Sequence, residues 1–207
     1  MYKVKNILSL LYLDGVYLQR DSHKYDARKA FGLLFLTISI AIGAATILSE
    51  LVFVNHKPFY YHIIILIASF GITFGVISSK LRMVISSIGN RIKNSTSWTV
   101  GAKALNGICW AVPFAAIAVF PTLYQYLILL GIGLGNFSTY LLMKKYSGLD
   151  NREQMIVGLV SLIAIPIVVE IDTTLFITRQ DIAVMFSRIL ISIAYGSGGI
   201  YGLTAKE

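Results

Sequence analysis

The chain has 207 residues, of which 56% are hydrophobic and only 14% are charged. A soluble protein carries about 25% charged residues, so this composition excludes a water-covered globular surface and leaves lipid as the main solvent. In a soluble protein the net charge of +8 would point to nucleic-acid binding. Here the basic residues lie between long apolar runs, so the membrane accounts for the charge and no nucleic-acid partner is expected.

Residues 1–30 precede the first long apolar run and mix apolar with charged side chains. Apolar residues such as Val4 and Leu11 fall on one helical face, with Lys5 roughly opposite. A helix of this kind lies in the plane of the membrane interface. We therefore predict an interfacial, cytoplasmic N-terminal segment, followed by a membrane domain over 31–207. A loosely ordered tail is the alternative.

Six apolar stretches follow, and each is long enough, or nearly so, to form a membrane-spanning helix of roughly 17–25 residues. They are residues 31–54, 61–79, 104–120, 123–143, 155–171 and 182–203. The third and fifth are at the short end of the range. The sequence predicts an all-α integral membrane bundle of six transmembrane helices.

The connections between these stretches differ strongly in their content of Lys and Arg. Fifteen of the 18 basic residues fall in segments on one side of the predicted bundle: residues 1–30, 80–103 and 144–154, and Lys206. Only Lys57 and Arg179 lie in connections on the other side. Because cytoplasmic loops carry the excess of Lys and Arg, we predict a multi-pass protein of the cell membrane with both termini in the cytoplasm.

Glycines gather in the second, fourth and sixth stretches, each after a bulky aliphatic run. Glycine lets two membrane helices approach closely because it has no side chain. Six glycines are predicted to lie at helix–helix contacts: Gly71, Gly75, Gly131, Gly135, Gly198 and Gly202. A repeat of three hairpins would explain the shared pattern, but close packing of glycine-rich helices without any duplication is the favoured explanation.

Polar side chains recur at helical spacing inside the predicted spans. Ser39, Thr46 and Glu50 share one face of the first helix. Because lipid cannot satisfy their hydrogen bonds, such faces should point at protein or water. The candidates for a substrate or ion pathway are Glu50, Arg188, Ser192, Tyr195, His62, Glu170 and Asp172. The alternative is that they are ordinary helix-end residues, wetted by lipid headgroups.

Glu50 and Arg188 are the two charged residues that lie within predicted spans rather than at their ends. A charge at mid-membrane costs about 2.5–3.5 kcal/mol on insertion scales. Both residues lie in the outer third of their helices, at similar depth. An ion pair between them would lower the cost for both, so the sequence predicts that they meet.

Metal and cofactor sites are not expected. Cys109 is alone in an apolar run, and His23, His56 and His62 lack the spacing of an HExxH motif. No Walker motif is present, so an ATPase would have to be a separate chain. Whether the chain is an enzyme is left open by these motifs, and a function without catalysis is the favoured reading.

Three classes of function fit this sequence. The first is transport: a small transporter or channel, or the membrane subunit of a multi-component transporter. The second is a structural or assembly subunit of a larger membrane complex. The third is a membrane-embedded enzyme acting at the outer face through Glu50, His56 or His62. The expected partners are membrane lipid and either other membrane proteins or further copies of this chain.

The predicted orientation can be tested by labelling single cysteines with a membrane-impermeant reagent in intact cells. Cysteines at positions 57 and 179 should react from outside, because both connections lack the basic excess. Cysteines at positions 93 and 150 should react only after the cells are opened. Labelling of position 93 from outside would contradict the orientation.

Overall fold

The computed structural model describes residues 2–55, 58, 60–77, 89, 93, 98–175 and 180–205, with side chains from residue 28 onward in these ranges, apart from 175, 180 and 181. Over these residues the fold is all-α, as predicted. The helices are α1 (Tyr2–Val54), α2 (Tyr60–Val76), α4 (Val100–Ala116), α5 (Tyr124–Leu142), α6 (Arg152–Glu170) and α7 (Gln180–Thr204).

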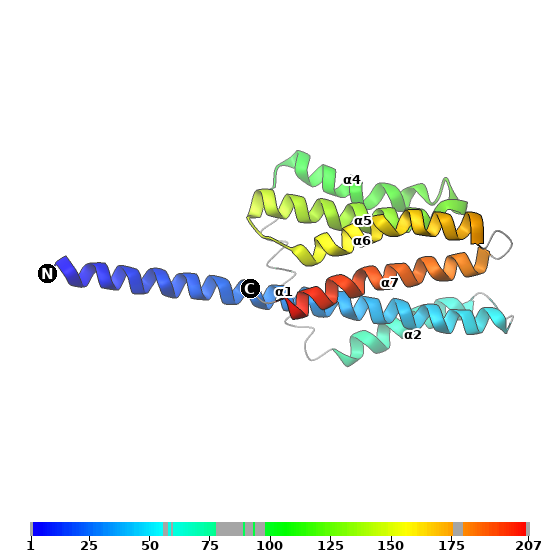
Figure 1. The fold of residues 1–207 in the computed structure, drawn as a ribbon, viewed down its shortest axis with the longest axis horizontal. Coiled ribbons are helices and arrows are strands. Elements are labelled where there is room, and N and C mark those ends of the chain that lie inside the picture. Colours follow the sequence, from blue (N-terminus) through cyan, green and yellow to red (C-terminus); the bar gives the residue numbers. More distant parts are fainter. Residues whose placement is uncertain are drawn as a thin grey trace.

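Helix α1 runs without a break from residue 2 to residue 54. Its N-terminal part extends beyond the end of the bundle as a straight continuation of the membrane-spanning part (Figure 1). The helix is therefore continuous across residue 30, where the sequence predicted a boundary between the N-terminal segment and the first span. The interfacial placement of residues 1–30 stays a prediction.

Four segments are long and apolar enough to cross a membrane: Arg28–Val54, Pro121–Ser147, Arg152–Thr174 and Ile182–Thr204. They correspond to the first, fourth, fifth and sixth predicted spans. The second and third correspond to α2 and α4, which have 17 residues each. Length and composition therefore support four candidate spans among the described residues, and the predicted count of six is not confirmed.

The six helices form a row of antiparallel neighbours in the order α2, α1, α7, α6, α5 and α4 (Figure 1). The first and last helices of the chain thus lie side by side in the middle of the row. Helices α2 and α4 lie at its opposite edges, where α2 packs against α1 and α4 packs against α5.

Helices α1 and α7 approach so closely that glycine backbones replace side chains at their contact. A Cβ atom on Gly32 would lie 2.8 Å from the carbonyl carbon of Gly202, and one on Gly199 would lie 2.6 Å from the amide nitrogen of Leu36. We call this contact the α1–α7 seam. It comprises Gly32, Leu36, Ser39 and Gly43 on α1, and Ser192, Gly196, Gly199 and Gly202 on α7.

Two serines tie the middle of the seam together. The Ser39 hydroxyl donates to the Ser192 carbonyl oxygen at 2.7 Å, and the Ser192 hydroxyl donates to the Ser39 carbonyl oxygen at 2.8 Å. Both hydroxyls are therefore satisfied across the contact. In lipid this matters, because no water is present to replace a missing partner.

The predicted packing glycines divide into two groups. Gly131 and Gly135 lie under the rings of Phe114 and Trp110 on α4, and Gly198 and Gly202 lie against α6 and α1: these four have neighbours on other helices. A Cβ on Gly71 or Gly75 would meet nothing within 4 Å in the described structure. Among the described residues α2 packs against α1 alone, and these two glycines face away from α1, so no described residue contacts them.

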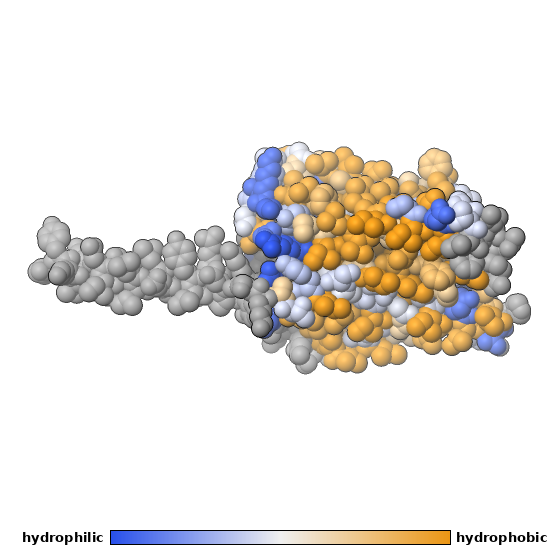
Figure 2. Space-filling view, in the orientation of Figure 1, coloured by the Kyte–Doolittle hydropathy of each residue, from blue (hydrophilic) through white to orange (hydrophobic). Residues whose placement is uncertain are grey.

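The surface of the bundle is an apolar belt between two polar ends (Figure 2). Large aliphatic side chains are exposed on every helix, for example Ile67 on α2 (66%) and Ile163 on α6 (62%). Residues Arg28, Lys144 and Arg152 mark what we call the basic end. An apolar belt flanked by polar ends, together with four apolar helices of spanning length, indicates a membrane protein.

Local signals set the helix ends at the basic end. The Thr99 side chain accepts a hydrogen bond of 3.2 Å from the Ala102 amide and caps α4. The chain leaves α5 through a π-helical turn, Met143–Ser147, and Gly148 ends it with a φ of 63°. This left-handed conformation favours glycine because it has no Cβ.

Replacing Gly32 by Ala should lower the free energy of unfolding in mild detergent by about 1–3 kcal/mol, because the new Cβ overlaps backbone atoms of α7. Gly71→Ala is the matched control. It has open space around its Cβ and should be neutral or stabilising by about 1 kcal/mol or less, from the higher helix propensity of alanine. Equal destabilisation by both changes would contradict the seam.

Candidate functional site

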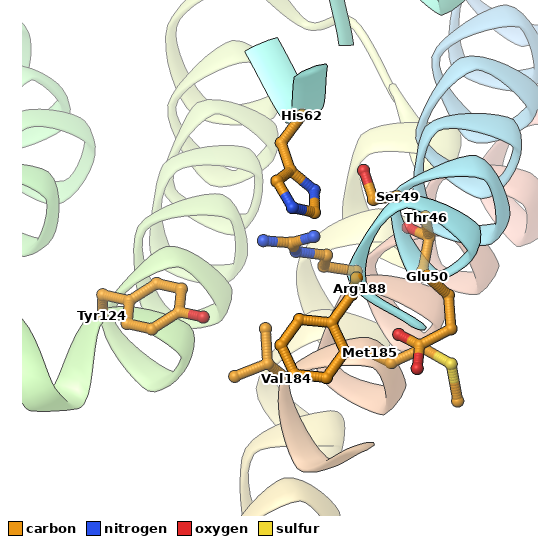
Figure 3. Close-up of a pocket in the computed structure, with 9 residues that line it drawn as sticks. Thr46, Ser49, Glu50, His62, Tyr124, Val184, Met185 and Arg188 are labelled. Carbon is orange, nitrogen blue, oxygen red and sulfur yellow. The ribbon is translucent and has the colours of Figure 1, made fainter. Parts of the chain in front are cut away.

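A pocket of about 270 Å³ opens at the end of the bundle that lies opposite the basic end. We call that end of the bundle the pocket end. It lies between α1, α2, α7 and the start of α5 (Figure 3). Its lining residues are Thr46, Ser49, Glu50, Phe53, His62, Tyr124, Val184, Met185 and Arg188.

Four helices bring these residues together. Ser49 and Glu50 follow Thr46 by three and four residues on α1, so both lie next to it on that side of the helix. His62 lies in the first turn of α2, and Tyr124 is the first residue of α5. The pocket thus combines residues from both ends of the sequence, and it depends on α1 and α7 lying side by side.

Arg188 enters the pocket from α7 with its guanidinium group directed towards His62 (Figure 3). The hydroxyl of Tyr124 points towards the same guanidinium. Glu50 lies on the other side of the pocket, and its carboxylate is directed towards Met185. Among the described residues no ion pair joins Glu50 to Arg188, so the pair expected from the sequence does not form: the two charged groups point in different directions.

Towards the basic end, the lining of the pocket does not extend past Thr46 on α1 or Arg188 on α7. Below it, the Thr46 hydroxyl donates to the Ile42 carbonyl oxygen at 2.8 Å, and the α1–α7 seam follows directly. Ser192, a predicted pathway residue, belongs to that seam through its bonds with Ser39. The polar stripe on α1 therefore has two parts: an inner part that packs against α7 and an outer part that lines the pocket.

Tyr195 packs in the core rather than in the pocket. Its ring lies 5.7 Å from that of Phe35, between α1 and α7. It joins the cluster of buried residues that includes Leu129, Val157 and Val168. A core aromatic at this position contributes to packing, so the structure does not bring it together with Glu50 and Arg188.

Glu170 and Asp172 lie at the pocket end of α6 but outside the pocket lining. Asp172 accepts hydrogen bonds from the Gln125 amide nitrogen at 3.2 Å and from the Tyr126 hydroxyl. These bonds join the start of α5 to the end of α6. Glu170 is exposed and accepts a 3.0 Å hydrogen bond from the Thr174 hydroxyl.

Besides Thr46, which the sequence placed on the polar face of the first helix, five lining residues were not among the sequence candidates: Ser49, Phe53, Tyr124, Val184 and Met185. Tyr124 carries a signal that could have been used, because tyrosine is enriched where a helix meets the membrane interface. The other four are ordinary residues of membrane helices. Only the arrangement of α1 against α7 selects them.

The basic end holds a further charged group that the sequence placed in a loop. Glu153 is fully buried in the first turn of α6, where the positive end of the helix dipole favours a carboxylate. Nearby, Arg152 pairs with Asp150 at 2.7 Å on the surface. Burial raises the pKa of Asp150, but the hydrogen bond and charge of Arg152 outweigh it, so the pKa of that carboxyl is lowered.

The pocket offers hydrogen-bond donors on one side and a carboxylate on the other. In the described part of the chain, no group of three His, Cys, Asp or Glu residues lies close enough to hold a metal ion. His56 lies outside the described residues. The arrangement suits non-covalent binding of a polar solute.

Comparison with known proteins adds no family to this description. No family model, no curated protein and no solved structure matches the chain.

Proposed function

We propose that this chain is a membrane transport protein that takes a small polar solute into the pocket between α1, α2, α5 and α7. The observation that carries the proposal is the position of Arg188. Its guanidinium lies inside a pocket of about 270 Å³ between apolar helices. Ionisable groups inside membrane bundles are costly and are typical of substrate and ion pathways.

The proposed orientation has the basic end in the cytoplasm and the pocket end outside, in the cell membrane. Three observations on charge support it. Fifteen of the 18 Lys and Arg residues belong to segments on one side of the predicted bundle. The basic residues Arg28, Lys144 and Arg152 lie at one end of the helices: Arg28 and Arg152 both contact Tyr201, and Lys144 lies near Arg152. The carboxylates of Glu50 and Asp172 belong to the opposite end.

We include α2 and α4 in the proposed membrane domain, which gives six spans. A helix of 17 residues is about 26 Å long, somewhat less than the roughly 30 Å of hydrocarbon. Both helices lie alongside the longer ones, and both expose aliphatic side chains such as Ile67 and Val112. Short helices at the edges of a bundle are accommodated by local thinning of the bilayer.

The α1–α7 seam directly below the pocket favours a carrier over an open channel. A solute in the pocket has the α1–α7 seam below it, so passage requires a rearrangement of that contact. The seam has few interlocking side chains, because glycine and serine form most of it. Such a surface allows two helices to shift along each other, as in shear motions of packed helices.

A second candidate function is a structural subunit of a larger complex, and the exposure of the edge helices favours it. Each of α2 and α4 has one main neighbour in the row. Gly71 and Gly75 on α2 present an open face of the kind that close helix partners use. Under this reading, another membrane chain or a second copy would cover α2.

Uptake into liposomes tests the transport proposal. The chain is purified in mild detergent with any chains that accompany it, reconstituted, and supplied with labelled sugars, carboxylates, amino acids and organic cations. At least one solute class should accumulate faster than in protein-free liposomes. Arg188→Gln should reduce that uptake by about tenfold or more, since a charge-assisted hydrogen bond contributes about 1.5–3 kcal/mol.

Arg152→Gln is the matched control, because Arg152 is a surface arginine at the opposite end of the bundle. It should leave uptake unchanged. Uptake that does not exceed the protein-free background for any solute, from folded protein with its partners, would contradict transport. If there is no uptake and the chain co-purifies with other chains at a fixed stoichiometry, the result would support a structural subunit.

A further inference from the structure

We infer that the pocket takes a small zwitterion, with its anionic oxygen group on Arg188 and its ammonium group on Glu50. The inference rests on the proposed function, since it names the class of solute that the same pocket would carry. Figure 3 shows the basis: the guanidinium and the carboxylate face the pocket from two sides and point in different directions.

Arg188 forms the anionic half of the site. Its planar guanidinium presents five N–H donors in a fork that matches a carboxylate. The Tyr124 hydroxyl accepts a hydrogen bond from this guanidinium and keeps its own proton to donate. Within the described residues no carboxylate forms an ion pair with Arg188. Because the guanidinium carries five N–H donors, donors other than the one used on Tyr124 remain for an external anion.

Glu50 forms the cationic half of the site. An ionised carboxylate only accepts hydrogen bonds, and an ammonium group only donates them. Ser49 and Thr46 line the same wall, and both are more than nine-tenths buried. The Thr46 hydroxyl uses its proton on the Ile42 carbonyl, so its oxygen remains an acceptor. Three oxygens from one face of α1 thus suit an ammonium group.

The two charges together select against simpler ions. A bare anion at Arg188 would be repelled by Glu50, and a bare cation at Glu50 would be repelled by Arg188, with little screening between apolar walls. The volume of about 270 Å³ is just below the roughly 300–1,000 Å³ of sites for drug-sized ligands. Phe53, Val184 and Met185 add apolar contacts for a short side chain or methylene groups.

Two sources carry this chemistry: a free amino acid and the headgroup of a zwitterionic lipid. Both join an anionic oxygen group to an ammonium group through a few carbon atoms. The pocket opens at an end of the bundle where either could reach it. A binding experiment with separate probes distinguishes them.

The test measures ligand-induced thermal stabilisation of the full-length protein in detergent. The zwitterionic probes are glycine, alanine, serine and valine, and short-chain phosphatidylethanolamine for the lipid source. The single-charge controls are acetate, propionate, ethylammonium and short-chain phosphatidylglycerol. At least one zwitterion should raise the unfolding midpoint, because a ligand that binds only the folded state stabilises it. The single-charge controls should have a clearly smaller effect.

Two variants assign the halves of the site. Arg188→Gln and Glu50→Gln should each weaken zwitterion binding by about tenfold or more. Glu170→Gln is the matched control for Glu50, because Glu170 is an exposed carboxylate at the same end but outside the pocket. The Glu170→Gln variant should bind the zwitterion as tightly as the unaltered chain does. A variant that does not fold is replaced by Ser49→Val, which removes an acceptor and keeps both charges.

The outcomes separate this inference from the proposed function. Zwitterion binding that requires both Arg188 and Glu50 supports the inference, even if liposomes show no uptake and transport fails. Binding of acetate or ethylammonium as strong as that of every zwitterion would overturn it. Failure of all zwitterions to bind, while another solute class is taken up, would overturn it and leave transport standing.

Discussion

The close contact between the first and last helices is the constraint on which the rest of this structure depends. Helices α1 and α7 are separated by most of the chain, yet Gly32 and Gly202 leave no room for a side chain between them. This contact places the α1–α2 pair beside the α4–α7 group and makes a single row. It also supplies two walls of the pocket, so the site exists only because the chain ends meet.

The physical basis of this contact differs from that of a water-soluble core. Lipid is as apolar as a leucine side chain, so burial of apolar surface does not drive helices together within a membrane. Close backbone approach and paired hydrogen bonds do so instead, and Ser39 and Ser192 supply such bonds in both directions. The pocket begins where the small residues end: at Glu50 and Arg188 the side chains become large and polar, and space opens between the helices.

Sequence reasoning located the helices well, because long apolar runs between charged connections leave the backbone few alternatives in lipid. It also selected Glu50, His62 and Arg188, since charge or an imidazole is conspicuous inside such a run. It did not foresee that Glu50 and Arg188 would point apart, because spacing along two helices does not give side-chain direction. Nor did it distinguish Gly71, which faces open space, from Gly131, which lies under an aromatic ring. The neighbour of a glycine is set by the order of helices in the bundle, and that order is a property of the fold.

The most direct measurement of the central claim is a disulfide across the seam. The Ser39 and Ser192 oxygens lie 3.2 Å apart, so cysteines at these positions come within reach of each other. In a chain carrying Cys109→Ala, Ser39→Cys and Ser192→Cys, mild oxidation in native membranes should give an intrachain disulfide. A chain with Ser39→Cys and Gly75→Cys should give none, because Gly75 faces open space. Cysteines at 39 and 192 that stay reduced, and that both react with a thiol reagent, would contradict the account.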